Sequence, residues 1–145
     1  MNKEKIAFIP RQYLAVIAVL LAIMMSVLDG TIMNIALPTL AHDFDVTPST
    51  AIWIVNAYQL VITMTLLSFA SLGDIYGYRR IFLIGISIFV GASLACTLST
   101  SFWMLTAARV IQGFGAACVM SVNTALIRLI YPPQILGRGM GVNAM

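Results

Sequence analysis

Charged residues are scarce in this sequence: Asp, Glu, Lys and Arg make up 9% of its 145 residues, where soluble domains carry about 25%. Because 61% of the residues are apolar, a soluble form of the chain could not cover its surface with polar groups. This composition excludes a soluble enzyme, a disordered chain and a nucleic-acid-binding protein. The net charge of +3 would fit a nucleic-acid partner in a soluble protein, but the positions of the basic residues indicate another role.

Cysteine and histidine are also scarce. The two cysteines, Cys96 and Cys118, fall near the end of one apolar stretch and deep inside another, so we expect no disulfide between them. The single histidine, His42, stands beside Asp43 and Asp45, which are too few ligands for a metal site. The sequence has no nucleophile with a neighbouring base, and it predicts no enzyme, no bound metal and no cofactor.

Most of the sequence consists of four long apolar stretches, at about residues 13–40, 49–72, 81–98 and 102–130. Each is close to or above the ~20 residues that a helix needs to cross ~30 Å of hydrocarbon. Lipid satisfies no backbone N–H or C=O group, and the stretches are too long and too uniformly apolar for barrel strands. The sequence therefore predicts an all-α membrane protein with four transmembrane helices, antiparallel because their connections are short.

Basic residues flank these stretches on one side only. They precede the first stretch, separate the second from the third, and lie at or after the end of the fourth, whereas the first and third connections contain none. They are Lys3, Lys5, Arg11, Arg79, Arg80, Arg128 and Arg138. Since basic residues near helix ends stay on the cytoplasmic side, we expect residues 1–12 and 131–145 to be cytoplasmic.

Two charged residues lie well inside the apolar stretches, Asp29 in the first and Arg109 in the fourth. Each costs at least ~2.5 kcal/mol at mid-membrane, and the helical rise places both at a similar depth in the outer half. We expect them to pair inside the bundle. Arg109 would favour the ionised carboxylate and desolvation the protonated one, so that conformation controls proton binding. A static ion pair that only fixes helix packing, or separate partners in other helices, is the alternative.

Polar residues recur on one face of the second and fourth stretches. In the second stretch these are Asn56, Gln59 and Thr63, and in the fourth they are Arg109, Gln112 and Asn123, with the small residues Gly113 and Ala116 between them. The two stripes suggest a shared aqueous cavity, with Tyr58 and Asn34 as further lining residues. Asn34 lies about 140° around the helix from Asp29, so the two cannot face one cavity. Alternatively, the amides only form hydrogen bonds to neighbouring helices.

Four segments of the chain form a recognisable set of motifs, namely residues 28–38 (LDGTIMNIALP), 53–60 (WIVNAYQL), 72–80 (LGDIYGYRR) and 109–117 (RVIQGFGAA). In this order they resemble motifs of the fourteen-helix drug/proton antiporters of the major facilitator superfamily. The resemblance covers essentially the whole chain. It implies that the four helices form the first part of an N-terminal six-helix bundle.

By this resemblance, Asp29 and Arg109 take proton-coupling positions, and the loop between the second and third helices stabilises one gating state. The loop residues concerned are Asp74, Gly77, Arg79 and Arg80. Ala70 replaces the usual first glycine of the loop motif, and Ile75 and Tyr78 stand where basic residues are common. With fewer charges, the loop could instead be no more than a topology anchor.

The resemblance also implies a function, which is proton-coupled export of drugs or other amphipathic small molecules across a bacterial inner membrane. The partners would be the lipid bilayer, protons, a small-molecule substrate and the remaining helices of a longer chain, and no nucleic acid. We expect the sequence to be a truncated N-terminal part, with residues 131–145 leading to a missing fifth helix. The alternatives are a different substrate carried by the same machinery, and a stand-alone four-helix membrane protein that acts as an oligomer or assembly partner.

Overall fold

A computed structural model describes the backbone of residues 4–130, and the side chains of residues 17–123 and 125. The described residues form α1 (Glu4–Asp43), α2 (Pro48–Tyr76), α3 (Tyr78–Thr97) and α4 (Phe102–Ile130). Each helix contains a segment that is long and apolar enough to cross a membrane. The chain is therefore an all-α integral membrane protein, as the sequence predicts. The expected cytoplasmic connection at residues 131–145 lies outside the described residues.

Two of the helices, α1 and α2, extend beyond their apolar stretches. α1 ends at Asp43 rather than near residue 40, and α2 continues to Tyr76 rather than ending near residue 72. The reason is that apolar character follows the thickness of the hydrocarbon layer, whereas a helix ends where its backbone hydrogen bonds end. Gly77 alone separates α2 from α3, and its φ of 92° is a conformation that residues with a Cβ rarely adopt.

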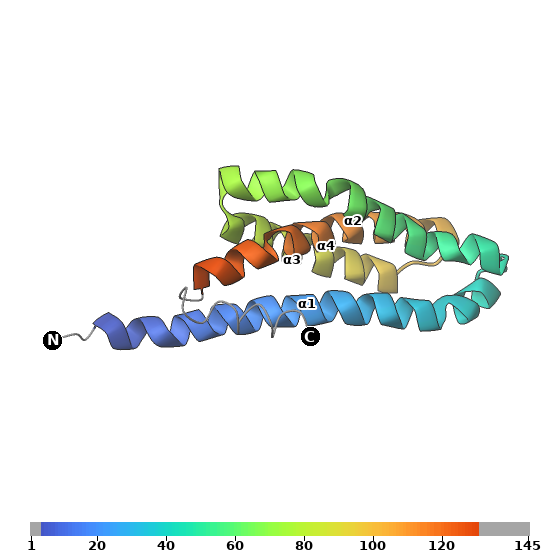
Figure 1. Cartoon of the computed structure of the whole chain (residues 1–145). Coiled ribbons are helices and arrows are strands. Elements are labelled where there is room, and N and C mark those ends of the chain that lie inside the picture. The colour runs from blue at the N-terminus through green and yellow to red at the C-terminus, as the bar shows by residue number, and fades with distance from the viewer. Residues whose placement is uncertain (1–3, 131–145) are drawn as a thin grey trace.

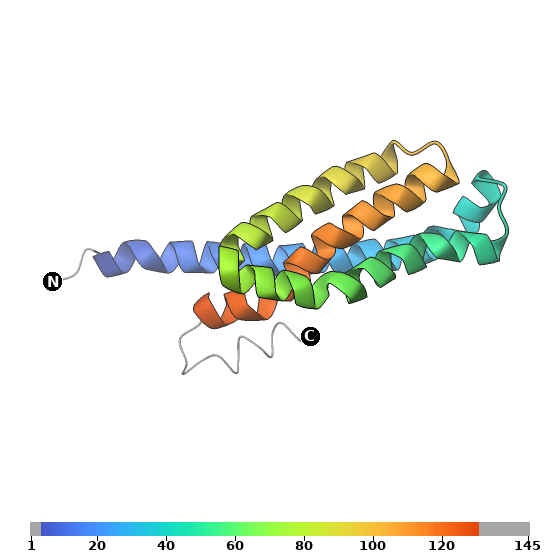
Figure 2. The same ribbon diagram turned by 90° about the horizontal axis from the view of Figure 1, so that it is seen from above.

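Successive helices run in opposite directions (Figure 1). The α1–α2 and α3–α4 connections lie at one end of the bundle, and the α2–α3 turn and the end of α4 lie at the other, where the start of α1 projects beyond them (Figures 1 and 2). Arg79 and Arg80 follow the α2–α3 turn. The side of the membrane that this end faces remains a prediction from the basic residues.

α4 is the central helix of the described bundle. In its most apolar segment 61% of the residues are buried, against 28% in α3 and 11% in both α1 and α2. Small residues permit close contact with α3, since a Cβ on Gly115 would lie 2.6 Å from the backbone nitrogen of Phe89, and one on Gly85 would lie 2.6 Å from the Cβ of Cys118. This central position places the polar residues of α4 among the other three helices.

Candidate functional site

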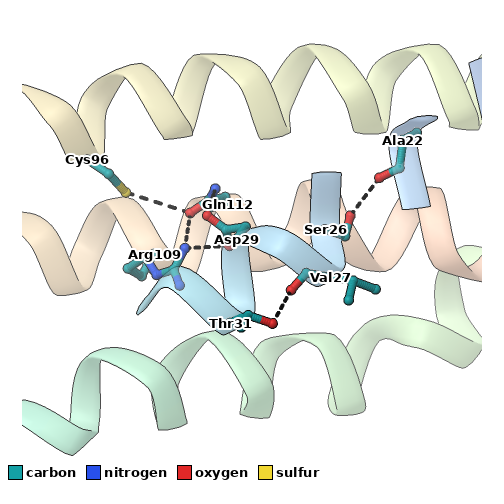
Figure 3. Close-up of polar contacts among 8 residues, drawn as sticks. All are labelled: Ala22, Ser26, Val27, Asp29, Thr31, Cys96, Arg109 and Gln112. Carbon is teal, nitrogen blue, oxygen red and sulfur yellow. Dashed lines mark hydrogen bonds and ion pairs between the residues drawn. The ribbon is translucent and has the colours of Figure 1, made fainter. Parts of the chain in front are cut away.

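The two membrane-embedded charges meet in the interior of the bundle (Figure 3). Nη1 of Arg109 on α4 donates a hydrogen bond of 2.7 Å to Oδ2 of Asp29 on α1. The Arg109 side chain is 1% exposed and the Asp29 side chain is 20% exposed. The cation is thus enclosed by protein, while the carboxylate keeps some access to the surroundings.

Gln112 closes this pair into a three-residue network. Its Oε1 accepts a 2.6 Å hydrogen bond from Arg109 Nη1, and its Nε2 donates a 3.1 Å hydrogen bond to Oδ1 of Asp29. Both carboxylate oxygens of Asp29 therefore accept a hydrogen bond from α4. Gln112 is 1% exposed. One turn of α4 after Arg109, its side chain faces the Asp29–Arg109 pair, and its expected place in a substrate cavity stays a prediction.

Tyr58 of α2 covers another side of Arg109. The Cζ atom of Arg109 lies 4.7 Å from the centroid of the Tyr58 ring, within the range of a cation–π interaction. Gly113 allows α2 to come this close, because a Cβ there would lie 3.0 Å from the carbonyl oxygen of Tyr58 and 3.1 Å from the Cβ of Val61. The guanidinium is thus held between a carboxylate and an aromatic ring.

Cys96 of α3 is a further member of this network, and the sequence analysis did not predict it. Its thiol donates to Oε1 of Gln112 over 3.7 Å (Figure 3), a long and weak contact. A cysteine in an apolar stretch resembles any small apolar residue in a periodicity pattern. No signal in this one sequence could have identified its contact with Gln112.

A groove of about 290 Å³ runs between α1 and α2, next to this network. Its lining includes three of the residues expected to contact substrate, namely Asn34, Tyr58 and Gln59, and also Gly30 on α1. Tyr58 is 5% exposed, and it belongs both to the groove and to the surroundings of Arg109. Asp29 and Asn34 thus have different surroundings, as their angular separation on the helix predicts.

The two polar stripes do not form one cavity. Asn56 and Thr63 adjoin Gln59 in a shallow hollow that α2 alone lines, whereas Arg109, Gln112, Gly113 and Ala116 are buried in helix contacts. Asn123, the remaining residue of the α4 stripe, is half-buried. The stripe on α4 turns toward α2 and α3 because its small residues allow these helices to approach closely.

The four residues of the expected gating loop surround a surface hollow at the α2–α3 turn, and all four are exposed. The Tyr78 hydroxyl donates a hydrogen bond to the Asp74 carboxylate. Within residues 17–123, no ion pair joins Asp74 to Arg79 or Arg80. Tyr78 therefore supplies a neutral partner for Asp74 at a position where the resembled family commonly has a basic residue.

The side chains described here form no cluster of three or more His, Cys, Asp or Glu residues that could hold a metal ion. His42 is exposed, and its Nδ1 lies 3.7 Å from Oδ1 of the neighbouring Asp43. The polar network of α1, α2, α3 and α4 is therefore the candidate site that the geometry supports best.

Comparison with known sequences gives consistent matches. The family model described as Major Facilitator Superfamily matches residues 19–145. The uncharacterized transporter YebQ of Escherichia coli K12 is 58% identical over 136 residues, which cover 94% of this chain and 30% of the relative. The riboflavin transporter RibZ of Clostridioides difficile is 35% identical over 132 residues, which cover 91% of this chain and 29% of the relative. The drug efflux pump JefA of Mycobacterium tuberculosis is 40% identical over 132 residues, which cover 90% of this chain and 26% of the relative. The chain spans less than a third of the length of these relatives.

Proposed function

The chain belongs to the Major Facilitator Superfamily, and on that premise we propose that it forms the opening helices of a secondary transporter that exports amphipathic small molecules, drugs among them, in exchange for protons. The observation that carries this proposal is the Asp29 carboxylate, which accepts hydrogen bonds from Arg109 and Gln112 inside the bundle. The name of the relative JefA, a drug efflux pump, supports the substrate class.

Proton binding would act on the contact between α1 and α4. Protonation of Asp29 removes its charge and turns one carboxylate oxygen into a donor, and neither Arg109 nor Gln112 Nε2 can accept a hydrogen bond from it. The contact between the two helices is therefore weaker when Asp29 is protonated. A conformation in which α1 moves away from Arg109 would bind the proton more tightly, and this difference in proton affinity links proton binding to conformation.

The same geometry would also serve a static ion pair that only holds α1 against α4. The Asp29→Asn variant below distinguishes these two roles.

The transporter would lie in a bacterial inner membrane with the start of α1 on the cytoplasmic side. This orientation rests on Arg79 and Arg80, which lie at the same end of the bundle as the start of α1 (Figure 1). Asp74, Gly77 and these two arginines would then form a cytoplasmic gating loop, in which Tyr78 holds Asp74 in place.

The test is Asp29→Asn in the full-length protein, assayed in everted membrane vesicles with ethidium as the probe and an imposed proton gradient. Asparagine keeps the size of the side chain but cannot bind the coupling proton. We expect proton-driven export to fall by at least about tenfold, while ethidium binding changes by less than about fivefold.

The matched control is Asp45→Asn, because Asp45 is exposed in the α1–α2 connection at a φ of 50° that asparagine also tolerates. We expect this variant to export ethidium at the wild-type rate. Unchanged proton-driven export in Asp29→Asn would eliminate Asp29 as the coupling residue and leave the static pair.

A further inference from the structure

Tyr58 is the residue that the α1–α2 groove and the ion-pair network share. On one side its ring lies 4.7 Å from the Cζ atom of Arg109. On the other side it lines the groove together with Asn34, Gln59 and Gly30. Among the residues that line this groove, Tyr58 is the one with a ring contact to the Asp29–Arg109 pair.

We propose that Tyr58 is the positioning residue through which a small molecule in the α1–α2 groove acts on the Asp29–Arg109 ion pair. This inference rests on the proposed function, which supplies the proton on Asp29. It adds a route by which occupancy of the groove changes that proton's affinity.

The backbone of Tyr58 cannot move far, because α2 packs against Gly113 of α4 with little space for a Cβ. A molecule that contacts Tyr58 therefore acts through its side chain. The ring has a negative face that attracts cations, and an amphipathic cation in the groove would compete with Arg109 for it. Because Arg109 is 1% exposed, water cannot replace the ring contact, so the guanidinium depends more strongly on Asp29.

The expected consequence is proton release. The titratable groups that face Asp29 are Arg109 of α4, Tyr58 of α2 and Cys96 of α3. When a bound cation draws the ring away from Arg109, the strengthened ion pair disfavours the protonated carboxyl. The proton then leaves the Asp29 carboxyl for bulk water.

The experiment measures protons released per ethidium bound, with a pH indicator in weakly buffered detergent solution of the purified full-length protein. Tyr58→Phe keeps the ring and should behave as the wild type. Tyr58→Leu keeps apolar bulk but removes the ring, and it should release fewer than about half as many protons per bound ethidium, with the dissociation constant changed by less than about tenfold. Tyr76→Leu is the matched control, because Tyr76 lies on the same helix and is 59% exposed.

Two results in Tyr58→Leu would overturn the inference. Wild-type proton release would show that the ring transmits nothing, and complete loss of ethidium binding would make Tyr58 a binding residue only. If the leucine variant does not fold, Gly30→Leu tests the groove without changing Tyr58, since a Cβ on Gly30 meets no atom within 4 Å. We expect ethidium binding and proton release to fall together by at least about tenfold, and unchanged binding would exclude the groove as the site.

Asp29→Asn separates this inference from the proposed function. If ethidium still releases protons from Asp29→Asn, the proposed function fails and the inference fails with it. If Asp29→Asn releases none while Tyr58→Leu behaves as the wild type, the proposed function stands and the inference alone is wrong.

Discussion

α4 contacts α3 on one side and α1 on another, and different side chains form the two contacts. Toward α3 the contact depends on close approach at Gly85 and Gly115, where an added Cβ would overlap neighbouring atoms. Toward α1 the central contact consists of hydrogen bonds that Arg109 and Gln112 donate to Asp29. Apolar packing is found on both sides of this polar contact, with Val19 of α1 in one cluster of buried side chains and Met33 beside another.

The difference shows which contact can respond to a proton. Packing of small residues depends on shape, which no change of pH alters. Hydrogen bonds to a carboxylate depend on its ionisation, so protonation of Asp29 weakens the α1 contact and leaves the α3 contact intact. We therefore expect α3 and α4 to move as a unit and α1 to be the helix whose position follows the proton.

The largest effect should come from Gly115→Leu, which breaks the contact that depends on shape. A Cβ at this position would already lie 2.6 Å from the backbone nitrogen of Phe89 and 2.8 Å from the carbonyl oxygen of Gly85. Backbone atoms cannot rotate aside, so we expect the free energy of unfolding to fall by more than about 3 kcal/mol. The measurement is the yield and the thermal unfolding midpoint of the full-length protein in detergent.

Gly91→Leu is the control for this variant, because Gly91 lies on α3 and an added Cβ there meets nothing within 4 Å. It should fold as well as the wild type or slightly better, since leucine favours helix over glycine by up to about 1 kcal/mol. Equal thermal midpoints for both variants would mean that α3 and α4 do not depend on close approach.

A smaller effect should come from breaking the polar contact with neutral amides. Asp29→Asn leaves the buried Arg109 charge without its counterion, and Arg109→Gln leaves the carboxylate without its cation. We expect each single variant to lose about 1–3 kcal/mol of stability, as for hydrogen bonds to charged groups. The double variant should regain at least half of this loss, because two amides can bond to each other without a buried charge. Additive losses in the thermal midpoints would contradict the coupling of these two residues.

The sequence alone predicted the features of the bundle that depend on composition and on how deep a residue lies in the membrane. The four helices follow from the length of the apolar stretches, and the meeting of Asp29 and Arg109 follows from their similar depth in antiparallel helices. The surroundings of Gln112 did not follow, because periodicity places a residue on a face of its own helix without saying which neighbour covers that face. The long α1 and α2 were also underestimated, since helices continue past the apolar segment that reveals them.

Two partners could not be derived from this one sequence. Tyr78 occupies a position where the resembled family commonly has a basic residue, yet it satisfies Asp74 by a hydrogen bond from its hydroxyl group. Cys96 approaches Gln112 from α3, sixteen positions earlier in the chain. The first contact depends on the geometry of the turn at Gly77, and the second depends on how α3 and α4 are rotated against each other.

The smallest effect should come from Cys96, which lies on α3 but contacts the polar network of α1 and α4. Its thiol donates a hydrogen bond over 3.7 Å to Gln112, and Gln112 in turn donates a hydrogen bond to Asp29. Cys96→Ala removes this donor, so Gln112 Oε1 is left to Arg109 alone, and a neutral hydrogen bond of this length contributes at most about 0.5 kcal/mol. We expect a small change in the pH dependence of ethidium export, and Cys96→Ser should restore the wild-type profile because serine keeps a donor.

Cys118→Ala is the control, since Cys118 packs against Gly85 without contacting the ion pair. This variant should lower the thermal midpoint while leaving the pH profile of export unchanged. If Cys96→Ala behaves instead as Cys118→Ala does, the contribution of α3 to the site is packing, and the response to protons lies in α1, α2 and α4 alone.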